Sequence, residues 1–330
     1  MIDLSIVVTC FDKRPFIPEF IRLSLELLDA GIEIVVVDDG STDGSAALLG
    51  AHVHMNPQIK FIALRQNQGS ANARNLGVEA CKRRYIFFLD IDDNCNLVNL
   101  QDSVKELSTT NSDLLIANLK VLPQNDLFRM PADVQSSTQF EMNAISSKIL
   151  ETMGYSRFIY SRKFIIEYSL RFFPIRPESQ FHNFILDDAF WLLLISASES
   201  TALVCEKERV VYYYNAPVST QSSWTFYVTQ LQLIPNLVMT FLNTFLQNTA
   251  LDRKLLIENS TKWMFQVLRP LDLNKLISSH LFSPVIIKSL WCFYRLVNLN
   301  RFILAKFYFF ILFFAFKNSV RIRTRIKVVN

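Results

Sequence analysis

The chain has 330 residues, of which 50% are hydrophobic, and it carries a formal net charge of +4. It is long enough for a large buried core, in one domain with an appendage or in two modest domains. Its five cysteines are scattered and show no Cys-x-x-Cys pair, which argues against a disulfide framework and favours a reducing cytoplasm. The amino terminus, MIDLSIVVTC, lacks the cationic start and apolar stretch of a secretory signal, so we expect a cytoplasmic protein.

Apolar runs in the first third of the chain predict strands, and helix-like segments lie between them. The runs lie near residues 4–10, 32–38, 59–64, 84–89 and 113–119. Residues 15–29 begin with two prolines and stop before a glycine, and residues 70–82 place Ala, Leu and Val at helical spacing. This alternation predicts an α/β fold with a mostly parallel sheet flanked by helices.

Three segments of different composition follow residue 119. Residues 120–140 are polar, contain two prolines and predict a loop or an excursion. A mixed stretch continues to about residue 222, and long helical patterns follow. We therefore expect a first domain and a helical carboxyl-terminal region, with bounds 1–222 (halves 1–120 and 121–222) and 223–330.

Two of the predicted strands run directly into clusters of carboxylates. The run IEIVVVDDGSTDGS ends on Asp38 and Asp39, and RRYIFFLDIDDN ends on Asp90, Asp92 and Asp93. Strands this apolar are buried on both faces, so their ends lie at the carboxyl edge of a parallel sheet, where open α/β folds bind ligands. Acids are costly there unless a cation or hydrogen-bond donors compensate them, and the pairing predicts a metal-and-diphosphate site.

The basic character of the chain belongs to its carboxyl-terminal segment. Residues 301–330 hold seven cations and no acid, so residues 1–300 carry 4 − 7 = −3. The apolar run FYFFILFFAF, at 307–316, reaches only about 15 Å as a helix, against a hydrocarbon core of about 30 Å. Followed by RIRTRIK, it predicts a helix over 301–327 that lies on a membrane surface with its cations facing anionic lipid. A terminal helix packed on the core is the alternative.

The ordered motifs SIVVTCFDKRPFI, VVVDDGSTDGS, NQGSANARNLGVEAC and YIFFLDIDDN resemble the family-2 glycosyltransferases of the GT-A fold. The resemblance covers residues 3–120 well, and a weaker one continues through IYSRKFIIEYSLRF, FILDDAFWLLL and VVYYYNAPVSTQSS to about residue 223. It implies a Rossmann-like domain, a nucleotide-sugar donor and inversion at the anomeric carbon by a single displacement.

The resemblance assigns nucleotide contacts to Thr9, Phe11, Asp39 and Arg74. A carboxylate can accept hydrogen bonds from a base imide, an aromatic ring can stack on the base, and an arginine supplies a charged donor fork. The alternatives are structural. Asp39 with the residues after it would form a turn that caps the next helix, and Arg74 would be an ordinary exposed arginine.

The run Asp90-Ile91-Asp92-Asp93 matches the family's Asp-x-Asp signature. Carboxylates at a strand end suit Mn²⁺ or Mg²⁺, which would stabilise the departing diphosphate. We assign metal contact to Asp92 and Asp93, and donor contact to Asp90 and Asp92; the alternative is that the acids cap a helix near residues 97–107. His52 and His54 lie one residue apart, as on one strand face, without a third ligand nearby, so we expect surface histidines.

The family carries an acidic pair at the start of a later helix, which here is Asp187 and Asp188. We assign Asp188 as the general base that accepts the acceptor's proton, with helix capping as the alternative. The expected function is transfer of a sugar from a nucleotide-sugar donor, UDP-linked by expectation, to a glycan or lipid-linked acceptor in cell-surface polysaccharide synthesis. No nucleic-acid partner is expected. A non-catalytic nucleotide- or glycan-binding relative and a haloacid-dehalogenase-type phosphohydrolase are the alternatives.

Overall fold

The computed structural model describes residues 2–122, 126–128, 139–142, 158–173, 187–213, 238 and 240–268. They belong to two compact units, Met1–Ser219 with Asn248–Asp252, and Thr220–Gln247 with Arg253–Asn330. The first unit carries the sheet and all the predicted site residues. The predicted boundary after residue 222, and the division of the first domain at residue 120, stay predictions.

Within the described residues, ten strands form one sheet in the order β3-β2-β1-β4-β9-β6-β10-β5, with β7 paired to β6 and β8 to β10. β1 runs parallel to both β2 and β4, and β6 runs parallel to β10, whereas β9 is antiparallel between β4 and β6. The strands are β1 (Leu4–Cys10), β2 (Glu33–Asp38), β3 (Lys60–Ala63), β4 (Tyr85–Asp90), β5 (Asn94–Cys95), β6 (Leu114–Leu122), β7 (Asp126–Phe128), β8 (Gln139–Glu141), β9 (Phe158–Ser161) and β10 (Thr201–Tyr213).

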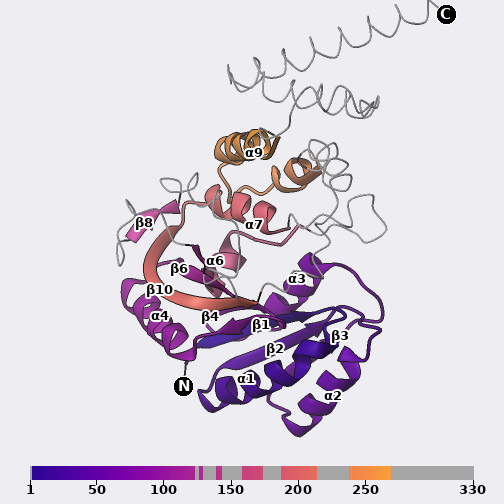
Figure 1. Ribbon diagram of the computed structural model, residues 1–330. Helices are drawn as coiled ribbons and strands as arrows, with labels where there is room; N and C mark the ends of the chain where they lie inside the picture. Colours follow the sequence, from indigo (N-terminus) through magenta and orange to yellow (C-terminus); the bar gives the residue numbers. More distant parts are fainter. Residues whose placement is uncertain are drawn as a thin grey trace, which may run out of the picture. The chain divides into compact units, whose positions relative to one another are not determined.

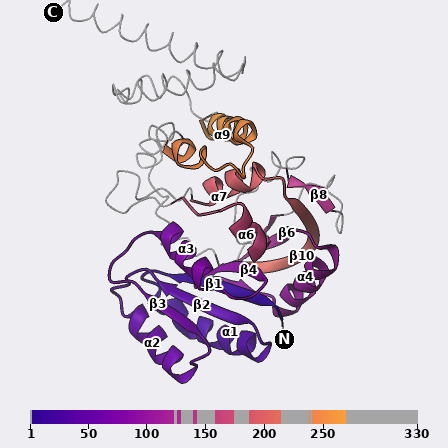
Figure 2. The ribbon, with the colours of Figure 1, turned by 180° about the vertical axis from the view of Figure 1, so that it is seen from behind.

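Helices cover both faces of this sheet. One face packs through a shared core against α1 (Ile17–Asp29), which follows the short 3-10 helix η1 (Arg14–Phe16), and against α2 (Ser45–Met55) and α4 (Leu97–Thr110). The helix α3 (Ser70–Ala80) packs on β1 and β2 from the other side. Figures 1 and 2 both show α3 and the pair α1–α2 on opposite sides of the strands. Two further described helices of this unit are α6 (Arg162–Glu167) and α7 (Asp187–Ser196).

The alternation of β1 divides its side chains between the two faces. Ile6 and Val8 join the core beneath α1, whereas Val7 faces α3. Helix and strand approach so closely there that a Cβ added at Gly77 would lie 2.3 Å from Val7 Cγ1. Glycine at this position therefore sets the distance between α3 and the sheet.

Aromatic rings fill the α3 side of the sheet. Phe88 of β4 and Tyr160 of β9 lie edge to face, with ring centroids 5.6 Å apart. Trp191 of α7 donates its indole N–H to Tyr160 Oη at 2.9 Å, and its ring lies 6.1 Å from that of Phe88. This cluster anchors α7 to the sheet, because its rings are buried and the indole has its hydrogen-bond partner.

The second unit is described mainly by α9 (Arg253–Leu268) and by the helical residues 240–245. Lys262 Nζ lies 2.9 Å from Glu258 Oε1 on the surface of α9. Among the residues that the structure describes, no helix combines the length and apolar character needed to cross a bilayer. The segment 301–327, predicted to lie on a membrane surface, falls outside the described residues.

The predicted α/β fold is confirmed, and the five predicted strands correspond to β1, β2, β3, β4 and β6. The polar segment 120–140 also contributes β7 and the start of β8. The expectation that both histidines lie at the surface is wrong for His52, which is buried in α2. A spacing of two places side chains on one face only in a strand, whereas in a helix it separates them, and His54 is the exposed member.

Candidate functional site

The carboxyl ends of β1, β2 and β4 lie in one layer. Cys10 is paired with Asp38 in the register of β1 and β2, and Thr9 is paired with Asp90 in the register of β1 and β4. The backbone continues this alignment beyond the strands, because Asp39 N donates to Cys10 O at 2.8 Å. The two acidic clusters predicted from sequence therefore meet at one edge of the sheet.

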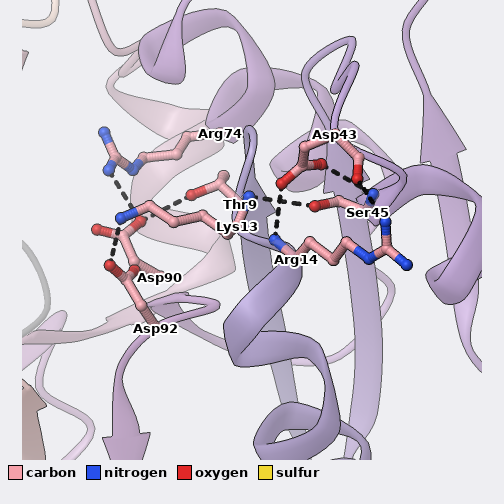
Figure 3. A network of polar contacts seen from close by, with 8 residues as sticks. All are labelled: Thr9, Lys13, Arg14, Asp43, Ser45, Arg74, Asp90 and Asp92. Carbon is pink, nitrogen blue, oxygen red and sulfur yellow. Dashed lines mark hydrogen bonds and ion pairs between the residues drawn. The ribbon is translucent and has the colours of Figure 1, made fainter. Parts of the chain in front are cut away.

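Asp90 is held by two residues from different elements. Thr9 Oγ1 donates to Asp90 Oδ1 at 2.7 Å, and Arg74 Nη2 lies 3.1 Å from the same oxygen (Figure 3). Arg74 is 5% exposed, so it is not the ordinary surface arginine of the alternative interpretation. The structure thus brings together three of the residues predicted to contact the nucleotide.

Asp92 is paired with Lys13, a residue that the sequence interpretation missed. Lys13 Nζ lies 2.5 Å from Asp92 Oδ2, and Figure 3 shows the ammonium reaching across to the acid from the loop after β1. Both side chains are partly open to solvent, at 34% and 23% exposure. The available signal was the position of Lys13, in the same loop that supplies Phe11.

Asp93 is the most buried of the three acids, at 6% exposure. Its Oδ2 has no hydrogen-bond partner among the described residues. Burial, together with the negative charges of Asp90 and Asp92, raises the pKa of Asp93 well above its ordinary value, although Lys13 and Arg74 oppose this effect. The helix-capping alternative is not supported, because the side chain of Asn96 caps α4 by accepting from Asn99 N.

The fit to a divalent cation is uneven. Within the part of the chain that the structure describes, no group of three or more His, Cys, Asp or Glu side chains is placed so that it could hold a metal ion by itself. Among the described residues, the acid cluster nevertheless sets three carboxylates against two cations, Lys13 and Arg74, and Asp93 Oδ2 is buried there without a hydrogen-bond partner. Mg²⁺ is often held by one or two carboxylates plus substrate phosphates, so Asp92 and Asp93 fit an ion completed by a diphosphate.

Asp39 faces the start of α3. Its Oδ1 accepts from Gln68 N at 2.7 Å, and its Oδ2 accepts from Gly69 N at 2.8 Å. Burial raises the pKa of Asp39, the two amide hydrogen bonds lower it, and the charge of Asp38 adds to the increase. The carboxylate thus ties the end of β2 to the loop that leads to Arg74, whereas its predicted nucleotide contact stays a prediction.

The loops after β1 and β2 are joined by a set of hydrogen bonds that we name the loop clamp. Asp12, at a positive φ of 50°, accepts from Thr42 N at 2.7 Å and from Asp43 N at 3.2 Å. In return, the amides of the first loop donate to side chains of the second, as Figure 3 shows in part: Asp12 N to Ser41 Oγ, Lys13 N to Ser45 Oγ, and Arg14 N to Asp43 Oδ2. The clamp fixes the backbone on both sides of Lys13.

Phe11 and Asp188 complete the predicted set. Phe11 immediately precedes the loop clamp and is 41% exposed, which leaves its ring accessible. The helix α7 begins at Asp187, so the backbone of Asp188 lies in its first turn. The side chain of Asp188 falls outside what the structure describes, and its role as a base stays a prediction.

The sheet order and the acids at its carboxyl edge define an α/β protein of the GT-A class, and the comparisons agree. Residues 1–349 of S. aureus TarS in complex with UDP-GlcNAc align with a TM-score of 0.63 at 17% identity, over 88% of this chain and 80% of that one. The mannosyltransferase PcManGT from Pyrobaculum calidifontis, in complex with GDP-Man and Mn²⁺, aligns with a TM-score of 0.50 at 13% identity, over 97% and 86% of the two chains.

The chain belongs to glycosyl transferase family 2, whose family model matches residues 5–169. Among curated proteins, it is 30% identical over 178 residues to the succinoglycan biosynthesis protein ExoO from Rhizobium meliloti. That alignment covers 52% of this chain and 51% of ExoO, so the chain spans about half the length of this relative.

Proposed function

We propose that the chain is an inverting glycosyltransferase that moves a sugar from a nucleotide-sugar donor to a glycan or lipid-linked acceptor in cell-surface polysaccharide synthesis. The observation that carries the proposal is the meeting of Asp39, Asp90 and Asp92 at one sheet edge, in a chain of this family. Support for the process comes from ExoO, which is named for succinoglycan biosynthesis. Support for a UDP-linked donor comes from the UDP-GlcNAc bound to TarS.

Different residues would bind the nucleoside end and the diphosphate end of the donor. Thr9, Phe11 and Asp39 would hold the nucleoside, while Arg74 and Asp90 would order the ribose and diphosphate side of the site. Asp92 and Asp93 would hold Mn²⁺ or Mg²⁺, which would supply positive charge to the departing diphosphate. The Mn²⁺ bound to PcManGT supports this assignment.

Asp188 would accept the proton of the acceptor hydroxyl as the new glycosidic bond forms. The acid stands in the first turn of α7, which the aromatic cluster anchors to the sheet. A single displacement with one base inverts the anomeric carbon, and the anomeric configuration of the product, measured by NMR, tests this step. Retention of configuration would exclude a single displacement.

A sugar-nucleotide panel distinguishes the proposed function from its alternatives. The purified chain is incubated with Mn²⁺ and UDP- and GDP-linked sugars, with and without lipid-linked acceptors. Release of nucleoside diphosphate supports transfer, release of free phosphate supports a phosphohydrolase, and tight binding without turnover supports a non-catalytic relative. In the phosphohydrolase alternative Asp90 would be the nucleophile, but that alternative gives no role to Asp39, which lies at the same edge of the sheet.

The sharper test is Asp92→Asn in the same assay. We expect a loss of transfer of about 100-fold or more, since a carboxylate that binds a catalytic metal makes a contact that matters most in the transition state. Asp29→Asn, at the exposed end of α1, is the matched control and should retain activity. Transfer that survives in Asp92→Asn would remove the proposed metal role.

We also propose that the protein is cytoplasmic and lies peripherally on the membrane through residues 301–327. The support is compositional, because an aromatic run followed by unopposed cations suits an anionic surface. Sedimentation with anionic vesicles should fall when residues 301–330 are deleted. Unchanged sedimentation would contradict the proposal, and equal binding to neutral vesicles would contradict its electrostatic part.

A further inference from the structure

Lys13 connects the loop clamp with Asp92 in the acid cluster. Its backbone amide donates to Ser45 Oγ at 3.1 Å, and its ammonium reaches Asp92 Oδ2 (Figure 3). The neighbouring residues Asp12 and Arg14 are fixed by the loop clamp. The backbone of Lys13 is therefore held in place, and any rearrangement of this residue is a movement of the side chain.

The Lys13–Asp92 ion pair is of a kind that Lys13 can give up for another partner. Both side chains are partly exposed, and ion pairs in such positions contribute little net stability because water competes for both charges. The ammonium also lies 5.5 Å from the centroid of the Phe16 ring, so an aromatic face lies alongside it. Asp90 differs, because its partner Arg74 is buried and a second donor, Thr9, binds the same oxygen.

The charges of the site would favour movement of the Lys13 ammonium from Asp92 to the donor diphosphate once a cation binds. A divalent cation bound to Asp92 would take the place of the ammonium and would repel it. A donor diphosphate would then bring negative oxygens to the same edge of the sheet, within reach of a long and flexible lysine side chain. The same ammonium would then have a carboxylate partner before the donor binds and a phosphate partner afterwards.

We propose that Lys13 is a donor-binding residue, which pairs with Asp92 before the metal and nucleotide bind and with a diphosphate oxygen once they are bound. This inference rests on the proposed function. It gives the two acids different roles. Asp92 is the carboxylate whose ion-pair partner leaves, whereas Asp93 is buried and its Oδ2 has no hydrogen-bond partner among the described residues.

The exchange predicts opposite effects of one substitution on two affinities. In Lys13→Met, Mn²⁺ alone should bind up to about fivefold more tightly, because its competitor for Asp92 is gone. The nucleoside diphosphate should bind about tenfold or more weakly in the presence of Mn²⁺, because a charge-assisted hydrogen bond is lost. A lysine that only held Asp92 in position would weaken both affinities when replaced.

The experiment uses the full chain and binding measurements. Mn²⁺ affinity is followed by electron paramagnetic resonance, and UDP and GDP affinities are followed by calorimetry at saturating Mn²⁺. Lys13→Arg should keep most of the nucleotide affinity, since it keeps the charge. Lys105→Met, an exposed lysine on α4, removes the same charge away from the site and should bind like the wild type. Thermal unfolding confirms that each variant is folded.

Two results would overturn the inference while leaving the proposed function intact. One is unchanged nucleotide affinity in Lys13→Met, and the other is a parallel loss of Mn²⁺ and nucleotide affinity, which indicates a purely structural role. If the wild-type chain binds neither UDP nor GDP with Mn²⁺, both the donor site and the role of Lys13 are refuted together.

Discussion

The ring of Phe172 lies flat against the indole of Trp191, with centroids 4.1 Å apart and planes 5° from parallel. Phe172 also lies beneath Arg74, whose guanidinium carbon is 5.5 Å from its ring centroid. Its backbone is bound at both polar atoms by Asn75, at 2.9 Å each. One residue thus joins α3, which carries Arg74, to α7, which begins at Asp187. Packing around Phe172 therefore links the position of α7 to that of α3.

Asn75→Ala should lower the free energy of unfolding by about 1–3 kcal/mol. The substitution removes two hydrogen bonds between α3 and Phe172, and each such bond contributes about 1 kcal/mol net. Denaturant unfolding measures the change. Asn72→Ala on the same helix loses an exposed hydrogen bond to Gln68, in the loop just before α3, and should stay within about 0.5 kcal/mol of the wild type. Equal effects of the two substitutions would contradict a linking role for Asn75.

Gly77→Ala should destabilise the protein by about 1–3 kcal/mol, although alanine favours helices. The new methyl would overlap Val7 Cγ1, so α3 must shift away from the sheet. Gly50→Ala in α2 is the matched control, because its new Cβ meets only Phe61 Cε1 at an ordinary 3.8 Å. That variant should gain up to about 1 kcal/mol. If Gly77→Ala is instead more stable than the wild type, α3 and β1 can adjust to the extra methyl group without a net cost.

The contribution of His52 to the stability of the protein should decrease as the pH falls below about 6.5. Burial lowers the pKa of His52 below its ordinary value of 6.5, so the unfolded chain binds the proton first. The geometry also requires neutral imidazole: Ser24 Oγ donates to Ile21 O and so accepts from His52 Nε2, while Nδ1 accepts from Asn56 Nδ2.

Denaturant unfolding at several pH values measures this dependence. One proton limits the slope to about 1.4 kcal/mol per pH unit. His52→Gln should flatten the curve between pH 7 and the folded-state pKa, whereas His54→Gln, exposed on the same helix, should leave it unchanged. If both variants keep the wild-type slope, another group is responsible.

Asp93→Asn should raise the free energy of unfolding at pH 7 by about 1–3 kcal/mol while weakening Mn²⁺ binding. A buried carboxylate oxygen without a partner among the described residues, next to two further acids, is costly in the folded state. The exposed Asp29→Asn should change stability by less than about 0.5 kcal/mol. A stabilised variant that still binds Mn²⁺ as tightly as the wild type would leave Asp93 without a metal role.

Sequence patterns predicted those parts of the structure that depend on local chemistry. Apolar runs located β1, β2 and β4, and the acids that end two of them proved to share one layer with Thr9. The insertion of β9 between β4 and β6 was not predicted, because antiparallel pairing over a long sequence separation leaves no local signature.

Side-chain partners were harder to predict than strands. Lys13 reaches Asp92 across 79 positions, and Asn75 reaches Phe172 across 97, so neither pairing has a sequence spacing that marks it. Asp12 was missed for a different reason. Its role depends on a backbone with positive φ that turns its carboxylate toward the second loop.

The loop clamp would have a thermodynamic consequence for the proposed binding of a nucleoside. Its hydrogen bonds order the backbone next to Phe11 when the protein folds. A nucleoside would therefore bind to a pre-organised surface, and the loops would not have to become ordered on binding. Association would then carry a small conformational entropy loss on the protein side, and discrimination between bases would arise from rigid shape complementarity.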